Sequence, residues 1–300
     1  MDKVRRSLVF GALCVICLTL AVGYALLRRS ESSAAGAEPA VVADTAAVAE
    51  MTSRPHVLFR HTTLDDSYGR LAVVPLDRPD GPRLLTSLSC ERVDLAAGSG
   101  LCLAADRGMI TTYRAEVLDS QFHIRHTIPL AGVPSRARVA PGGRLAALTY
   151  FVSGDSYAAA GFSTRTLLVD TENAGPPANL EEFVVSRDGA RFKAVDFNFW
   201  GVTFAARPGT FYSTLSSGGK MYLIEGDAST RTARVLRDGL ECPSLSPDNR
   251  HIAFKRRMPG IRLLWQIYVL DLESGTEEAV AETRSVDDQV AWLDDRTLLY

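Results

Sequence analysis

By residue type and spacing, the strongest candidates for acid–base catalysis or metal binding are three pairs of adjacent aspartates: Asp65–Asp66, Asp287–Asp288 and Asp294–Asp295. Paired carboxylates can share a proton or bind a cation. Adjacent side chains on an extended chain point to opposite faces, however, and the sequence has no D-x-D-x-D-G calcium loop. Turn formation therefore explains the pairs better than catalysis does. Asp287 and Asp288 remain binding candidates because they begin a predicted strand.

His123 and His126 form an H-x-x-H motif, a spacing that binds metal ions when it lies on a helix. The surrounding HIRHTIPL predicts a strand, on which this odd spacing places the two rings on opposite faces. The remaining histidines have no acidic residue or cysteine at a metal-binding offset. The chain also lacks the G-x-S-x-G elbow of α/β hydrolases. We therefore expect no metal, no cofactor and no enzymatic activity.

The elements that must position these residues are short strands in a repeat, which is clearest between Glu241 and Thr283. This repeat consists of the segments CPSLSPDNRHIAFKR, LLWQIYVLDLESG and TEEAVAE. Each is rich in β-branched or aromatic residues and is closed by Pro, Asp, Asn or Gly, which favour turns. This pattern predicts a four-stranded antiparallel sheet of the kind that forms one blade of a β-propeller.

An apolar run ending in aspartate marks the end of the third strand in five successive repeats, at Asp77, Asp119, Asp170, Asp227 and Asp271. Successive aspartates lie 42, 51, 57 and 44 residues apart. One propeller blade takes roughly 40 to 45 residues, so the two longer intervals require insertions. The sequence therefore predicts an all-β protein with a six-bladed propeller over residues 55–300.

The predicted blades divide the chain as follows. The first has only three strands and lacks its inner one: Val57–His61, Leu71–Leu76 and Arg83–Leu88. The next four cover residues 90–131, 134–187, 198–239 and 240–284. The sixth begins at DDQVAWLDDRTLLY and is incomplete at Tyr300, so we expect a C-terminally truncated propeller whose native form is about 40 residues longer, the length of one blade.

The mouth of the central channel is the binding region that this architecture predicts. The inner strands would bring four candidates there: Asp287, Asp288, Glu241 and Arg138. Asp196 and Asn198 fall at corresponding strand ends. Insertions at 154–165 and 173–180 are interpreted either as disordered surface loops or as partner-binding loops, since propeller insertions emerge where binding surfaces form.

The N-terminal region predicts membrane attachment. Ser7–Leu27 has 21 residues without a formal charge between basic flanks, and as a helix it would span about 31 Å, enough for a bilayer core. We expect residues 1–6 in the cytoplasm, a single transmembrane helix or signal anchor at 7–27, and a flexible Ala/Ser/Glu-rich tether at 28–54. The propeller would then lie on the extracytoplasmic side of the cytoplasmic membrane. The A-x-A match at Ala35-Gly36-Ala37 keeps cleavage and secretion as the alternative.

The net charge of the chain limits the classes of partner that it is expected to bind, and its cysteine content bears on possible disulfides. From Ser30 onward the chain has 28 basic and 34 acidic residues, a net negative balance that argues against nucleic acid. Outside the predicted anchor lie Cys90, Cys102 and Cys242. Cys102 should pair across the turn at Gly98-Ser99-Gly100 with a residue near Ala96, so we expect three buried, unpaired thiols.

The repeat resembles the Pro-Asp type β-propeller repeat of TolB, most clearly in CPSLSPDNRHIAF and WQIYVLDLESG. With its N-terminal segment, the chain resembles TolB-like propeller proteins with a signal or anchor found in actinobacteria. The resemblance implies a six-bladed propeller outside the cytoplasm that acts as a protein-binding scaffold without catalysis. TolB itself has a separate α/β domain before the propeller and a cleaved signal, whereas this chain has an anchor and a tether.

These observations give two functional expectations. The first is a membrane-tethered scaffold, a monomer that binds an envelope protein or a cell-wall component. The second is a small-ligand or glycan-binding sensor or enzyme that uses the central channel, which would need convergent polar groups at the ends of the inner strands.

Overall fold

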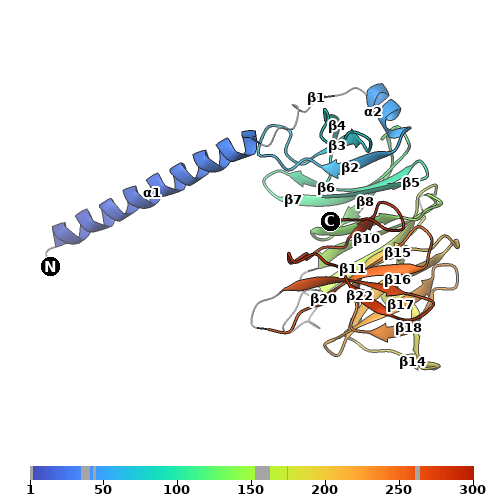
Figure 1. The fold of residues 1–300 in the computed structure, drawn as a ribbon. Helices are drawn as coiled ribbons and strands as arrows, with labels where there is room; N and C mark the ends of the chain where they lie inside the picture. The colour runs from blue at the N-terminus through green and yellow to red at the C-terminus, as the bar shows by residue number, and fades with distance from the viewer. Residues whose placement is uncertain (1–2, 35–40, 43–44, 153–162, 174, 261–263) are drawn as a thin grey trace. The chain divides into compact units, whose positions relative to one another are not determined.

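The structure is a computed structural model of the 300-residue chain, and it describes residues 3–34, 41–42, 45–152, 163–173, 175–260 and 264–300. The chain divides into two compact units, Met1–Ser87 and Leu88–Tyr300. Most of the described residues outside the first helix lie in antiparallel β-sheets (Figure 1). The all-β class predicted from the repeat is confirmed for this part of the chain.

The first unit consists of two helices and one four-stranded sheet with the order β1-β4-β3-β2. Its elements are α1 (Lys3–Ala34), β1 (Val41–Val42), α2 (Thr45–Thr52), β2 (His56–Arg60), β3 (Arg70–Pro75) and β4 (Leu84–Ser89), the last of which ends two residues beyond the unit boundary. The strands β2, β3 and β4 match the three predicted for the first blade. β1 adds to the sheet in parallel alongside β4.

The predicted tether contains regular structure in this unit. α1 continues to Ala34, and α2 lies within the segment expected to be a flexible linker. Val48 of α2 is 2% exposed and α2 contacts β3, so this helix is held by burial of an apolar side chain. Among the described residues, no helix combines the length and the apolar character needed to cross a bilayer.

In its described residues, the second unit contains five sheets that follow one another along the chain. The first is β5 (Arg92–Ala96), β6 (Ser99–Arg107), β7 (Thr111–Leu118) and β8 (Ile124–Leu130), and the second is β9 (Pro134–Val139), β10 (Leu145–Val152), β11 (Ser163–Asp170) and β12 (Ala178–Asn179). The third is β15 (Asn198–Phe204), β16 (Thr210–Ser217), β17 (Lys220–Asp227) and β18 (Thr232–Asp238) with two added strands, β13 (Val184–Arg187) and β14 (Ala190–Phe192). The fourth is β19 (Glu241–Leu245), β20 (His251–Arg257), β21 (Trp265–Asp271) and β22 (Glu277–Ala279), and the fifth is β23 (Ala291–Trp292) with β24 (Leu298–Leu299). Each predicted repeat in this unit thus corresponds to one sheet that resembles a propeller blade.

The recurrent aspartate at the end of the third strand shapes the turn that follows it. Asp119, Asp170, Asp227 and Asp271 each accept hydrogen bonds from backbone N–H groups that lie two to four residues ahead. In Asp227, for example, Oδ1 accepts from the Ser229 N–H at 2.8 Å and from the Thr230 N–H at 3.1 Å. Such turns reverse the chain between the third and fourth strands, which explains why the same residue type recurs at blade spacing.

Successive sheets of the second unit pack against one another through apolar side chains. Leu101 and Leu103 of β6 share a buried cluster with Leu148 of β10, and Leu168 of β11 shares the next cluster with Phe199 of β15. Further clusters join the third sheet to the fourth and the fourth to the residues around β23. The core therefore lies between the sheets, as it does between the blades of a propeller.

The cysteine prediction is wrong for one pair, because Cys90 and Cys102 form a disulfide with their Cα atoms 5.5 Å apart. The expected register is also wrong, because Cys102 lies opposite Val93, whereas Ala96 pairs with Ser99. Cys90, however, precedes β5 in the connection from β4, so the ladder does not fix its position. Cys242 remains a free, buried thiol, and Cys14 and Cys17 are free and exposed.

The connection between the second and third sheets differs from the sequence expectation. The expected insertion at 154–165 lies mostly outside the described residues. Downstream of the second insertion, the 3-10 turn η1 (Leu180–Glu182) leads into β13, which pairs in parallel with β18 and antiparallel with β14. This hairpin extends the third sheet from four strands to six, with β14 at its edge.

Candidate functional site

The first strands of successive sheets in the second unit are joined by direct hydrogen bonds. The Val139 N–H of β9 donates to Asp94 of β5 at 2.7 Å, and Arg92 Nε donates to the Ser135 carbonyl at 2.7 Å. Further along, the amide Nε2 of Gln289 donates to the carbonyl oxygens of Val202 and Pro243. The inner strands thus converge on the segment just before β23.

Asp288 is paired with arginines from two sheets. Its Oδ1 lies 2.9 Å from Arg136 Nη2 of β9, and its Oδ2 lies 3.5 Å from Arg92 Nη1 of β5. The Arg136 side chain is only 17% exposed, whereas Asp288 is 45% exposed. The carboxylate therefore compensates a mostly buried cation while keeping one side open to solvent.

Asp287 pairs with Lys255 on the neighbouring sheet. The Lys255 side chain is 7% exposed, and its ammonium lies 4.1 Å from the centre of the Trp265 ring. Burial of an ammonium is unfavourable unless it is paired, so the carboxylate and the aromatic face account for its position. The two adjacent aspartates thus point to different partners, as expected of neighbours on an extended chain.

Arg138 occupies the same face of β9 as Arg136. Its Nη2 donates to the Val290 carbonyl at 3.2 Å, and its Nη1 lies 4.0 Å from Asp94. Burial raises the pKa of Asp94 above its ordinary value, against the opposing effects of Arg138 and the Val139 N–H. Arg138 therefore links the second sheet to the segment entering the fifth.

Glu241 begins β19 beside the same group of charges. Burial raises the pKa of its carboxyl, Asp287 adds to this effect, and Lys255 opposes it. With Glu241 included, four cations and four carboxyls meet at this position, and we call them the central cluster: Arg92, Arg136, Arg138, Lys255, Asp94, Glu241, Asp287 and Asp288. All four residues selected from the sequence belong to it.

Other candidates from the sequence have local roles. Asp196 binds the turn between β16 and β17, accepting from Ser217 Oγ at 2.7 Å and from the Gly218 N–H at 2.6 Å. Asn198 accepts from the Thr164 N–H at 2.9 Å and so ties β15 to β11. His123 lies near Asp119, while His126 contacts the Glu172 carbonyl, so the two rings have separate partners. Within the described ranges, no group of three His, Cys, Asp or Glu residues is arranged to hold a metal ion.

Five contributors to this region were not selected from the sequence: Arg92, Asp94, Arg136, Lys255 and Gln289. One signal for Arg136 was available, because PSRARV places it two residues from Arg138 and therefore on the same face of a strand. Lys255 carried no such signal. It lies in HIAFKRR, where a basic residue at a strand end ordinarily reads as exposed.

Comparison with known proteins shows a distant structural similarity to TolB-like and other β-propeller structures. TolB from Acinetobacter baumannii matches with a TM-score of 0.51 at 15% sequence identity, covering 78% of this chain and 54% of that one. A puromycin-hydrolyzing peptidase of Mycobacterium tuberculosis matches with a TM-score of 0.52 at 12% identity, covering 82% of this chain and 41% of that one. This chain thus spans about half the length of these structures or less. No protein-family model and no curated protein sequence matches the chain.

The charged side chains of the central cluster are held by contacts with one another and with the backbone. Three of its four carboxylates are each within 4.0 Å of a cation, and its arginines donate to backbone carbonyl oxygens. Such contacts hold the paired side chains in one orientation. Burial raises the pKa of both Asp94 and Glu241, which favours the protonated form of these two carboxyls.

Proposed function

We propose that the chain forms a TolB-like six-bladed β-propeller, tethered to the cytoplasmic membrane with its propeller on the extracytoplasmic side, that acts as a non-catalytic scaffold for an envelope protein or cell-wall component. Support for six blades comes from the repeat spacing and from sheets that pack face to face in chain order. Support for membrane attachment comes from the uncharged run Ser7–Leu27 and from α1, on which Phe10 is 70% exposed and Leu20 is 68% exposed.

The observation that carries the scaffold proposal is the charge balance of the central cluster. Asp94, Asp287 and Asp288 pair with cations from several sheets, so the cluster keeps the inner strands together and still presents polar groups to solvent. A partner would gain hydrogen bonds and charge complementarity there without the protein holding an unpaired buried charge. Propeller faces of this kind suit the binding of another polypeptide.

Site-specific photo-crosslinking tests this proposal in cells that naturally make the protein. A photoreactive amino acid replaces Arg257, an exposed residue at the end of β20 whose charge acts on Glu241. A matched control carries the same group at Ser229, an exposed residue on the turn after β17. We expect a discrete adduct from position 257 in the membrane fraction and none from position 229. Equal labelling from both positions, or none from either, would count against the scaffold.

A small-ligand or glycan-binding channel is the second candidate, and Glu241 favours it. A half-buried carboxyl with a raised pKa, opposite a buried lysine that itself lies over a tryptophan ring, is a common feature of ligand sites. Thermal unfolding with soluble peptidoglycan fragments tests this alternative. A rise in the unfolding temperature that Glu241→Gln removes would support it, and an unchanged temperature would reject it.

A further inference from the structure

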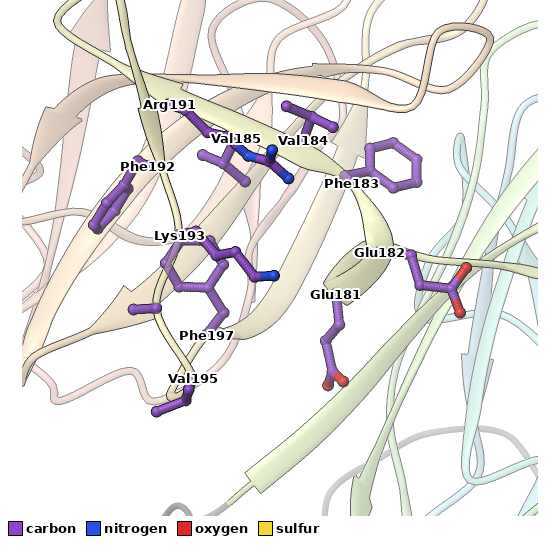
Figure 2. A pocket seen from close by; sticks show the side chains of 11 residues that line it. Glu181, Glu182, Phe183, Val184, Val185, Arg191, Phe192, Lys193, Val195 and Phe197 are labelled. Carbon is purple, nitrogen blue, oxygen red and sulfur yellow. The ribbon is translucent and has the colours of Figure 1, made fainter.

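A pocket of about 300 Å³ lies at the open end of the β13–β14 hairpin and shares no residue with the central cluster. The lining comes from Glu181–Val185, Arg191–Val195 and Phe197 (Figure 2). The last register pair of the hairpin is Val185 with Phe192, and beyond it the two chain segments diverge. The pocket occupies the space between them.

Aromatic contacts fix one wall of this pocket to the core. The Phe197 ring lies 5.0 Å from that of Phe192 and 5.9 Å from that of Phe199, in edge-to-face arrangements. Phe192 also lies 5.8 Å from Tyr222. Because Phe199 and Tyr222 are buried in the third sheet, this wall is supported and presents an apolar surface that needs little ordering when a ligand binds.

Two cations, Arg191 and Lys193, and two acids, Glu181 and Glu182, also line this pocket. The Arg191 and Lys193 side chains are exposed, and within the described parts of the chain no hydrogen bond or ion pair joins either side chain to Glu181, Glu182 or another residue. In Figure 2 the Lys193 ammonium points into the space between its own segment and the turn that carries Glu181. Val195, 81% exposed, and Val184, 47% exposed, add apolar surface at the rim.

We propose that this pocket binds an acidic peptide segment of the partner protein, with an apolar side chain entering the pocket and a neighbouring carboxylate bound by Arg191 and Lys193. The inference rests on the proposed scaffold function and assigns it one binding site. The cations select a carboxylate by charge complementarity, and the phenylalanine wall selects an apolar side chain. The volume is at the lower limit of small-molecule pockets, which suits a single side chain.

The position of β14 favours a peptide over a free small molecule. β14 is the terminal strand of its sheet, and no further strand of the described residues pairs with it. An extended segment can hydrogen-bond along such an edge while its alternate side chains reach a neighbouring pocket. Cations at an edge strand also prevent two copies of the protein from pairing through that strand. The test must therefore distinguish binding of an acidic peptide from prevention of this self-association.

Fluorescence anisotropy with labelled probe peptides provides that test on the full chain in detergent. The probe is acetyl-Glu-Phe-Glu-Leu-Glu with a C-terminal fluorophore, and the reference probe has lysine in place of each glutamate. We expect the acidic probe to bind about tenfold more tightly than the basic one, and the Arg191→Ala/Lys193→Ala variant to lose about tenfold of that affinity. Val195→Asp should weaken binding similarly, because it places a carboxylate at the rim.

Lys220→Ala removes an exposed cation outside the pocket and serves as the control, with unchanged affinity expected. Equal affinity for the two probes, or unchanged affinity in the double variant, overturns the inference. If the double variant self-associates in size-exclusion chromatography but binds the acidic probe normally, the cations only protect the edge and the inference also fails. If the parent protein does not bind the acidic probe but crosslinking at position 257 is retained, this pocket is rejected and the scaffold proposal stays intact. If the parent protein binds the probe but gives no crosslink at position 257, the central face is rejected as the partner-binding surface.

Discussion

Asp288 lies 2.9 Å from Arg136, and this pair joins the segment that precedes β23 to the inner strand β9 of another sheet. The two residues are 152 positions apart in the sequence, so the contact closes a large part of the second unit. The pair holds Arg136 in a mostly buried position, where an unpaired guanidinium would be unfavourable.

Removing the Asp288 carboxylate should therefore destabilise the second unit. We expect Asp288→Asn to lower the free energy of unfolding by about 1 kcal/mol, because Arg136 loses its charged partner while solvent still reaches the site. Urea unfolding followed by tryptophan fluorescence measures the change. In a double-mutant cycle with Arg136→Gln, a coupling energy near zero would show that the pair contributes nothing.

The disulfide should contribute measurably to stability. Cys90 and Cys102 are 12 residues apart, and a crosslink of that span restricts the unfolded chain by about 3 kcal/mol in the chain-entropy model. The Cys90→Ser/Cys102→Ser variant should therefore melt at a lower temperature than the parent, and reducing agent should lower the melting temperature of the parent alone. Mass spectrometry after alkylation supplies an independent check: Cys242 should be labelled only after unfolding. Labelling of Cys90 without reductant would contradict the pairing.

The aspartate turns should give an acid-sensitive contribution to stability. Hydrogen bonds from the Ser229 hydroxyl and the Thr230 N–H lower the pKa of Asp227. A lowered carboxyl pKa stabilises the fold above the ordinary value of 3.8, and this contribution is lost as the pH falls through the folded-state pKa. We expect Asp227→Ala to unfold about 1 kcal/mol more easily at pH 7, with the difference shrinking as the pH falls below about 4. Asp227→Asn, which keeps one acceptor oxygen, should show a smaller loss, and a pH-independent difference would argue against the ionised turn.

Glu241 should show the opposite pH dependence. Burial raises its pKa, so the unfolded chain releases this proton at lower pH than the folded one, and ionisation above the ordinary value of 4.5 favours unfolding. Relative to the parent, Glu241→Gln should therefore be more stable at pH 7 than at pH 4. Urea unfolding at the two pH values measures this change, and Glu273→Gln, at an exposed acid, serves as the control. Greater relative stability of Glu241→Gln at pH 4 would reverse the sign and reject the explanation.

The strands and their grouping into sheets follow from local patterns. Apolar alternation, turn residues and the recurrent aspartates can all be recognised within about 40 residues, the span of one blade. The backbone hydrogen bonds between the strands of a blade form within the same span. Asp119, Asp170, Asp227 and Asp271 could be recognised from the sequence because each binds the N–H groups of its own turn. The residues at the ends of inner strands, including Asp288 and Arg138, followed from the same repeat.

Only the tertiary structure decided which of these residues pair and where the chain departs from the repeat pattern. The burial of Lys255, the disulfide from Cys90 and the strands β13 and β14 depend on segments that meet through folding, and no local pattern encodes those distances. Local hydrogen bonding thus set the blades, whereas the compensation of buried charge and the extension of the third sheet depended on contacts between distant parts of the chain.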